Sequence, residues 1–286
     1  MFKLYIDDVL DEIVGTNVGC RLGLLRINIL AYADDLVLIS DSQDNLAKLY
    51  GILHERMQQL HLSINKIKSK AMIFKQSNRS DGTTELMMGD DIFEVVSQYK
   101  YLGHILEDNL QDIKDIELRL NSFYGKFNWV FRNFKNTSLD VLTFLFNAYC
   151  TPDYGLPLWY LDELLKKQAF KTFQVAYNNA IKRMLGVPIS SSSHAAAEAC
   201  NILLLNHHSI FAQTRFYKRI LRSNNSVLRI LYYNLLEGFI YKSLSKQFDQ
   251  KYSCKIRENG IDILKARIFW VQRHEDRTGR QLNFIA

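Results

Sequence analysis

Two short apolar runs, residues 27–33 and 36–39, flank a pair of adjacent carboxylates, Asp34 and Asp35. Apolar runs of this length are typical of buried strands, and two aspartates between them suit the tight turn of a hairpin. Neighbouring carboxylates repel each other and lose hydration in apolar surroundings unless a positive charge lies beside them. The pattern therefore favours one of two structures. One is a divalent-cation site, because Mg²⁺ prefers carboxylate oxygens, and the other is a hairpin tip that faces water.

Amphipathic helices are predicted on both sides of this hairpin. Residues 2–14 place apolar side chains at helical spacing and acidic side chains on the other face. Residues 5–8 repeat the Tyr-x-Asp-Asp pattern inside this helix, so we expect solvated acids and no metal site there. After the hairpin, Ser42 or Asp44 caps a helix that runs to about residue 60. The apolar stripe of that second helix consists of Leu46, Leu49, Leu53, Met57 and Leu60.

Short β segments and polar turns follow. A polar turn that carries three lysines leads into a strand-like segment at 71–74, and the Gly- and Ser-rich residues 75–90 predict a loop. Residues 92–96 alternate as a strand does. Residues 99–106 then combine aromatic side chains, a lysine and Gly103. Glycine lets a backbone approach a sugar–phosphate chain closely, while the aromatic rings and the lysine offer stacking and charge. A core strand with buried tyrosines is the alternative.

The second half of the chain has helical periodicity. Helices are predicted over residues 112–131, 138–149 and 162–185, with an interruption at 150–160 that contains two prolines. Farther on, four basic residues fall at i, i+3, i+4 and i+7 and so form one stripe of a helix. The stripe either follows nucleic-acid phosphates or is a solvated face. Its members are Arg215, Lys218, Arg219 and Arg222.

Charge divides the chain into two halves. Residues 1–120 carry 13 Lys and Arg against 19 Asp and Glu, whereas residues 121–286 carry 23 against 11. A basic half suits binding to nucleic-acid phosphates, although charged residues also simply solvate helix faces. The four cysteines are far apart and are typical of free thiols in an intracellular protein, in the nucleus or the cytoplasm. No run approaches the roughly 18 apolar residues of a membrane-spanning helix, so no membrane partner is expected.

The exact residues of the hairpin carry a resemblance. Tyr32-Ala33-Asp34-Asp35, after an apolar strand and before Leu36-Val37-Leu38, resembles the catalytic hairpin of reverse transcriptases, in particular those of non-LTR (LINE-type) retrotransposons. The resemblance implies that Asp34 and Asp35, with a third aspartate from an earlier strand, hold two Mg²⁺ ions. It also implies that Tyr32 lies at the nucleotide and that the ions activate the primer 3′ hydroxyl for phosphoryl transfer.

Two later segments resemble the same family in the same order. The lysine-rich turn resembles the motif that lies beside the incoming nucleotide's phosphates. Lys68 is the preferred lysine for that role, and Lys66 and Lys70 are the competitors. In the alternative, all three are solvated lysines of a loop. Tyr101-Leu102-Gly103 resembles the hairpin that grips the primer strand. The resemblance is strong over residues 1–106. Beyond them, the helical region and the phrase IKRMLGVP are similar to the thumb and the region after it.

The resemblance implies an α+β fold with three parts: a partial palm of antiparallel strands and packed helices at 1–107, a helical thumb-like region at 108–188, and a basic helical region at 189–286. Its partners would be an RNA template, a DNA primer and deoxynucleotides. In the family, the fingers, the first catalytic aspartate and the template-gripping motif precede the helix at residues 2–14. We therefore expect the C-terminal half of such an enzyme, inactive or very weak alone and dependent on a partner that supplies the missing half. A non-catalytic nucleic-acid-binding remnant and a maturase-like RNA-binding protein are the alternatives.

Overall fold

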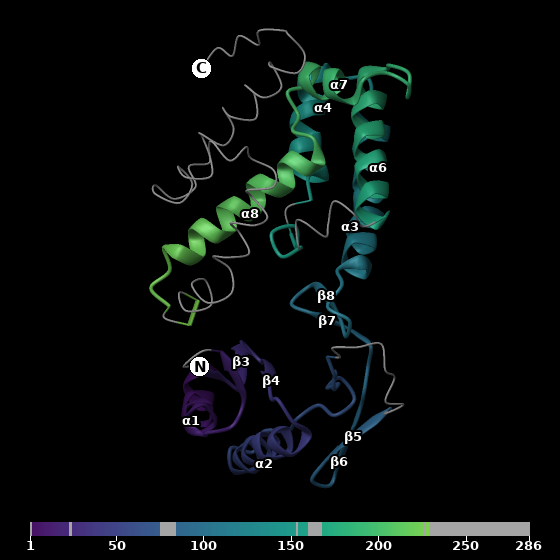
Figure 1. The fold of residues 1–286 in the computed structure, drawn as a ribbon. Coiled ribbons are helices and arrows are strands. Elements are labelled where there is room, and N and C mark those ends of the chain that lie inside the picture. Colours follow the sequence, from purple (N-terminus) through teal and green to yellow (C-terminus); the bar gives the residue numbers. More distant parts are fainter. Residues whose placement is uncertain are drawn as a thin grey trace. The chain divides into compact units, whose positions relative to one another are not determined.

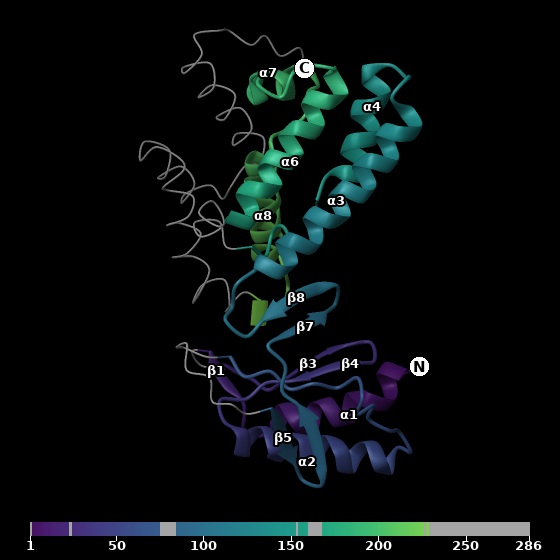
Figure 2. The ribbon, with the colours of Figure 1, turned by 90° about the vertical axis from the view of Figure 1, so that its right-hand side faces the viewer.

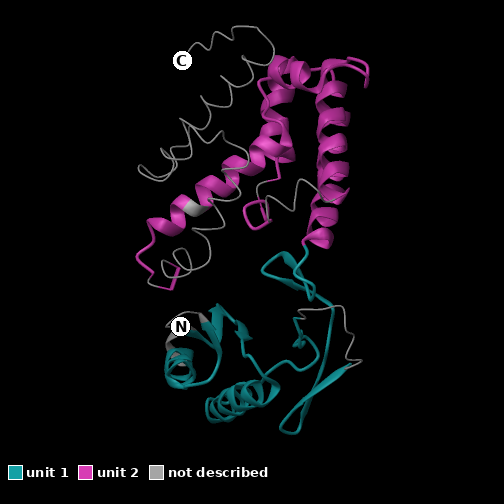
Figure 3. Ribbon diagram, viewed as in Figure 1, with its two compact units in different colours: residues 1–111 teal, residues 112–286 magenta. Residues whose placement is uncertain are grey.

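The computed structural model describes residues 2–22, 25–74, 84–152, 154–159, 168–225 and 227–228. The chain divides into two compact units, residues 1–111 and 112–286 (Figure 3). The first unit contains small antiparallel hairpins and two helices, and the described part of the second is helical (Figure 1). This composition confirms the predicted α+β class. The predicted division into three parts stays a prediction.

Unit 1 is built from hairpins and helices that alternate along the chain. Helix α1 (Phe2–Gly15) leads to the antiparallel pair β1 (Cys20–Leu22) and β2 (Leu25–Ile27). The pair β3 (Ile29–Tyr32) and β4 (Asp35–Leu38) precedes helix α2 (Gln43–Gln59). Two more antiparallel pairs complete the unit, β5 (Glu85–Met88) with β6 (Asp91–Glu94), and β7 (Gln98–Tyr101) with β8 (His104–Glu107).

The core of unit 1 lies between the two helices and the hairpin strands. Apolar residues of α1, among them Ile6 and Ile13, pack with Leu49, Leu53 and Met57 of α2, as the predicted stripes require. The β3–β4 hairpin adds partly buried apolar side chains to this cluster, and Figure 2 shows both helices beneath it. Ser42 is the N-cap of α2, and its hydroxyl accepts a hydrogen bond from the main-chain nitrogen of Asn45.

A second cluster covers another face of α2. Tyr50 packs there with Ala71, Leu86, Met88 and Phe93. The strand expected at 71–74 is instead a single bridge between Ala71 and Val95. The main-chain nitrogen of Ala71 donates to the carbonyl of Glu94 at 2.9 Å, and no ladder continues from it over residues 72–74. The prediction was wrong because an apolar run satisfies a strand pattern whether or not a partner strand lies beside it.

Unit 2 is a helical assembly around an aromatic core. Its described elements are α3 (Ile113–Phe134), α4 (Leu139–Leu145), the π-helical turn η1 (Phe146–Cys150), α6 (Gln168–Leu185), α7 (Ser193–Ala199) and α8 (Leu205–Leu221). The predicted helix at 138–149 is thus α4 continued by a π turn. Residues 160–167, where the third helix was predicted to begin, lie outside the described residues. Buried rings from α3, η1 and α6 pack together, including Phe123, Phe146, Phe173 and Tyr177.

Candidate functional site

The acidic pair lies at the tip of the β3–β4 hairpin. Tyr32 faces Asp35 in the strand register, so Ala33 and Asp34 form the two-residue turn, with Ala33 at a φ of +54°. Ile29, Leu36 and Leu38 anchor the hairpin on the α1–α2 core. The apolar strands therefore hold the base of the hairpin, while Asp34, Asp35 and the 63% exposed ring of Tyr32 face solvent.

The chemistry of this tip fits part of a magnesium site. Within the described part of the chain, the carboxylates of Asp34 and Asp35 form no hydrogen bond or ion pair. Their carboxylates are thus available as hard oxygen ligands, which Mg²⁺ prefers. Among the same described residues, no group of three or more His, Cys, Asp or Glu side chains could hold a metal ion. The tip therefore supplies two adjacent carboxylates and leaves the rest of a coordination shell to water, substrate or another protein segment.

The β7–β8 hairpin has a two-residue turn formed by Leu102 and Gly103. Their φ values are +46° and +82°, and two consecutive positive φ values are characteristic of the type I′ turn that joins twisted strands. Tyr101 pairs with His104 across the turn. Burial raises the pKa of the Tyr101 phenol above its ordinary value, and the negative charge of Asp35 raises it further. The turn residues Tyr101, Leu102 and Gly103 therefore lie on a hairpin that comes close to the acidic tip.

The lysine-rich turn is the third part of the site. The side chain of Asn65 accepts a hydrogen bond from the main-chain nitrogen of Lys68 at 3.1 Å, and the Tyr99 hydroxyl donates to the carbonyl of Lys68 at 3.3 Å. Tyr99 and Tyr101 are two positions apart on β7, so their side chains leave the same face of the strand. That face contacts the lysine turn through Tyr99, and its Tyr101 is within electrostatic reach of Asp35.

The three lysines of this segment differ in their partners. Lys66 forms an ion pair with Asp91, and the ammonium of Lys70 lies 2.6 Å from a carboxylate oxygen of Glu94. Lys68 is exposed, and its ammonium forms no hydrogen bond or ion pair with the described residues. Of the three candidates, Lys68 is thus the one whose charge is available to a ligand.

Comparison with known families bears on this geometry. Residues 1–106 match a protein family described as reverse transcriptase (RNA-dependent DNA polymerase). The match covers 106 of the 286 residues, so it shows what this segment is similar to. A search of curated proteins finds no significant match to the chain. Reverse transcriptases act on nucleic-acid templates with deoxynucleotides and use divalent metal ions, and an exposed pair of carboxylates is compatible with that chemistry.

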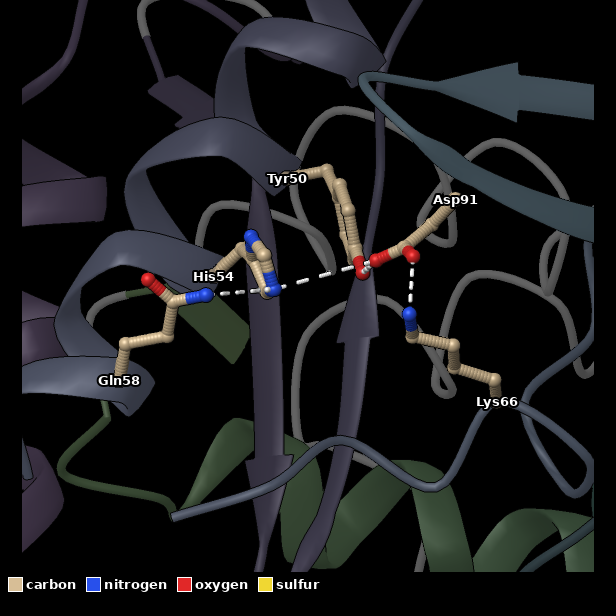
Figure 4. A network of polar contacts seen from close by, with 5 residues as sticks. All are labelled: Tyr50, His54, Gln58, Lys66 and Asp91. Carbon is tan, nitrogen blue, oxygen red and sulfur yellow. Dashed lines mark hydrogen bonds and ion pairs between the residues drawn. The ribbon is translucent and has the colours of Figure 1, made fainter. Parts of the chain in front are cut away.

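A buried carboxylate within the matched residues 1–106 was not identified from the sequence. Asp91 is 6% exposed and accepts hydrogen bonds from the Tyr50 hydroxyl and the Lys66 ammonium (Figure 4). His54 lies 3.9 Å from the same carboxylate and receives a contact from Gln58. The Lys66 hydrogen bond, followed by that of Tyr50, lowers the pKa of Asp91. The sequence predicted a polar loop over residues 75–90. Only the alternating apolar side chains from Ile92 onward indicated a strand next to Asp91.

The predicted basic stripe lies on α8 and its C-cap, Arg222, in unit 2 and outside the matched residues 1–106. Arg215, Arg219 and Arg222 are exposed, and Lys218 is half-buried. The opposite side of α8 is buried, where Gln213 donates a hydrogen bond to the main-chain carbonyl of Trp159 at 2.5 Å. The helix therefore presents its cations on its open side. Among the described residues, no helix is long and apolar enough to cross a membrane.

Proposed function

We propose that this chain is part of the RNA-directed DNA polymerase of a LINE-type retrotransposon, with Asp34 and Asp35 as ligands of Mg²⁺. The observation that carries the proposal is the arrangement around β7. One face of this strand borders Asp35 through Tyr101 and the Lys68 turn through Tyr99. A carboxylate pair suited to a metal and a lysine turn suited to phosphate thus belong to elements linked through one strand, in a segment that matches reverse transcriptases.

Each group has a part in nucleotide addition. Bound Mg²⁺ would favour ionisation of the primer 3′ hydroxyl and offset the negative charge of the phosphoryl-transfer transition state. Asp34 and Asp35 would supply carboxylate oxygens to that ion, and the exposed ring of Tyr32 offers a surface for the nucleotide. Lys68 would neutralise triphosphate oxygens. The Leu102–Gly103 turn, with Tyr101 beside it, would contact the primer backbone.

We infer that the isolated chain polymerises weakly or not at all. The described residues supply two carboxylates at the hairpin tip and no cluster of three acidic groups. A two-metal site needs more anionic oxygens than two aspartates provide, because each ion requires about six ligands and much of its charge balanced. An RNA template, a DNA primer and a further segment that supplies another carboxylate are therefore the proposed partners.

A direct test is Mn²⁺ binding, followed by electron paramagnetic resonance, in the wild-type chain and in the Asp34→Asn and Asp35→Asn variants. Asp8→Asn is the matched control, because residues 5–8 carry the same Tyr-x-Asp-Asp pattern within α1 and Asp8 is exposed there. We expect binding to be lost in both hairpin variants and kept in the control. Binding that survives in both hairpin variants would contradict the proposed site. Primer extension on an RNA template, with the same variants, measures the activity itself.

A second function, nucleic-acid binding without catalysis, is favoured by the exposed cations of α8. It requires no metal. A salt-dependent gel shift that is unchanged by Asp34→Asn, in a chain that shows neither Mn²⁺ binding nor extension, would support this function over the polymerase.

A further inference from the structure

The turn that carries Lys68 has little hydrophobic anchoring of its own. Ile67, between the two lysines of the turn, is 86% exposed. Residues 72–74 do not continue a strand ladder. Ile64 and Ala71 anchor the two ends of the segment on the core. Between them the contacts are polar and reach two strands: Lys66 and Lys70 contact Asp91 and Glu94 of β6, and the carbonyl of Lys68 contacts Tyr99 of β7.

Asp91 is the most buried group among these contacts. It opens β6, directly after the turn formed by Gly89 and Asp90, where Gly89 has a φ of +62°. Its carboxylate meets the Tyr50 hydroxyl, and the Tyr50 ring packs edge-on against Phe93 in the second core cluster of unit 1 (Figure 4). Asp91 is therefore fixed by the core on one side, while its other oxygen faces Lys66.

The Lys66–Asp91 contact differs from the exposed pairs around it. Burial removes water from the Asp91 carboxylate, which costs free energy, and the attraction to the Lys66 ammonium offsets that cost. Loss of the ammonium would leave the cost without the attraction, so burial of Asp91 favours the pair. The two pairs differ in their carboxylates: Asp91 is 6% exposed beside a 55% exposed Lys66, whereas Glu94 is 62% exposed beside a 27% exposed Lys70. A carboxylate that water solvates depends less on its cation. Lys66 is thus the residue that fixes the turn to the core.

We propose that Asp91 is a positioning residue for Lys68: by holding Lys66, it fixes the 65–68 turn so that the Lys68 ammonium meets the triphosphate of a nucleotide. This inference rests on the proposed function of Lys68. The same turn carries both lysines. Lys66 is paired with Asp91, whereas the Lys68 ammonium has no partner among the described residues. Tyr99 supports the same geometry from β7, because its hydroxyl holds the Lys68 carbonyl.

The test is a double-mutant cycle on binding of Mg²⁺–dTTP, measured by calorimetry. Lys68→Met is expected to weaken binding about tenfold, which is typical for loss of one charge-assisted contact to phosphate. Asp91→Asn alone is expected to weaken dTTP binding severalfold. Added to Lys68→Met, it is expected to have no further effect. Equal losses from Asp91→Asn with and without Lys68 would show a merely structural role and overturn the proposal.

Matched variants separate positioning from folding. Glu94→Gln breaks the exposed ion pair of the same segment and should leave dTTP affinity unchanged. Lys66→Met removes the ion pair with Asp91 while Asp91 keeps its hydrogen bond from Tyr50, and it should weaken dTTP binding. Lys66→Arg should bind dTTP as the wild-type chain does, because it keeps a cation at this position. Failure of Lys66→Met to weaken binding, in a chain that remains folded by circular dichroism, would also overturn the proposal.

Hydrogen exchange makes the test independent of nucleotide binding. The main-chain amides of Lys68 and Ser69 both bond to Asn65, so their exchange reports on the turn. Asp91→Asn should accelerate both, and Glu94→Gln should not. A wild-type chain that binds no dTTP would contradict the proposed function of the lysine, whereas the exchange rates would still decide whether Asp91 fixes the turn. Unchanged exchange in Asp91→Asn would overturn the positioning role itself.

Discussion

The side-chain amide nitrogen of Asn28 lies 2.6 Å from the main-chain carbonyl oxygen of Ile13, to which it donates a hydrogen bond. Ile13 lies near the end of α1, where carbonyl groups lack helical partners. The carbonyl of Asn28 in turn accepts a hydrogen bond from the main-chain nitrogen of Ile39 at 2.8 Å. Asn28 is 3% exposed. One buried polar residue thus fastens the end of α1 to the base of the hairpin that carries Asp34 and Asp35.

Replacement of Asn28 should destabilise unit 1. Asn28→Leu removes a buried side-chain hydrogen bond while the Ile13 carbonyl keeps its contacts with Thr16, so the expected cost is about 0.5–1.5 kcal/mol of unfolding free energy. Urea unfolding measures the change. Asn17→Leu, at an exposed position in the same connection between α1 and β1, is the control and should be close to neutral. A neutral Asn28→Leu variant would show that the contact adds no stability.

Gly19 and Gly51 should respond in opposite directions to alanine. A Cβ at Gly19 would lie 2.7 Å from the Cβ of Asn28 and 2.8 Å from the carbonyl oxygen of Ile27, and the φ of Gly19 is +128°. Gly19→Ala should therefore destabilise the protein by more than about 1 kcal/mol. Gly51 lies within α2, and a methyl group added there would meet nothing within 4 Å, so Gly51→Ala should stabilise by about 0.5–1 kcal/mol. Paired thermal melts of the two variants test both signs.

Acid should weaken the Asp91 network. The pKa of Asp91 is lowered in the folded protein, first by the Lys66 hydrogen bond and then by that of Tyr50. A lowered carboxyl pKa stabilises the fold above the unfolded value of about 4, and this contribution is lost as pH falls through the lower folded value. Wild type should thus lose more stability than Asp91→Asn between neutral pH and pH 3. Asp90→Asn, at the exposed neighbouring position, should follow the wild-type profile in thermal melts.

Cys150 should be a slow thiol. It is 2% exposed in η1, and burial raises its pKa to about 11, although Lys126 acts in the other direction. Only the thiolate reacts with iodoacetamide, so alkylation at pH 8 should be at least about 100-fold slower than in the urea-unfolded chain. Peptide mass spectrometry measures the rate at this residue. Equal rates in the folded and unfolded chains would be inconsistent with a buried η1.

Exposed cations of α8 should contribute to nucleic-acid affinity. Arg215→Gln and Arg219→Gln should each reduce the slope of log affinity against log salt by about 0.7 on single-stranded RNA, because each removes one phosphate contact. Gel shifts or anisotropy over a salt series measure the slope. Lys171→Gln, at an exposed position of α6, is the control of equal charge. Identical slopes for all three variants would assign the affinity to overall charge and not to the α8 stripe.

The sequence determined the parts of this protein that depend on neighbours within a few residues. Helical spacing located α1 and α2 together with their buried faces. Apolar runs around Asp34 located the acidic hairpin, and Gly103 marked the turn of the β7–β8 hairpin. These features could be predicted because capping, periodicity and turn preferences act locally. The same local signals failed at residues 71–74, where strand formation required a partner, and at 146–150, where an α pattern adopted a π turn.

Tertiary structure decided which of the similar residues are engaged. Three lysines in one polar segment have the same local pattern, yet Lys66 and Lys70 form ion pairs and the Lys68 ammonium has no partner among the residues that the structure describes. The difference comes from Asp91, which is 25 residues from Lys66 and 41 from Tyr50 along the chain. Likewise, Trp159 donates to Asp115 across 44 residues at 2.9 Å. Such partners are set when helices and hairpins pack, because burial makes an unpaired charge costly, and no local period in the sequence records that choice.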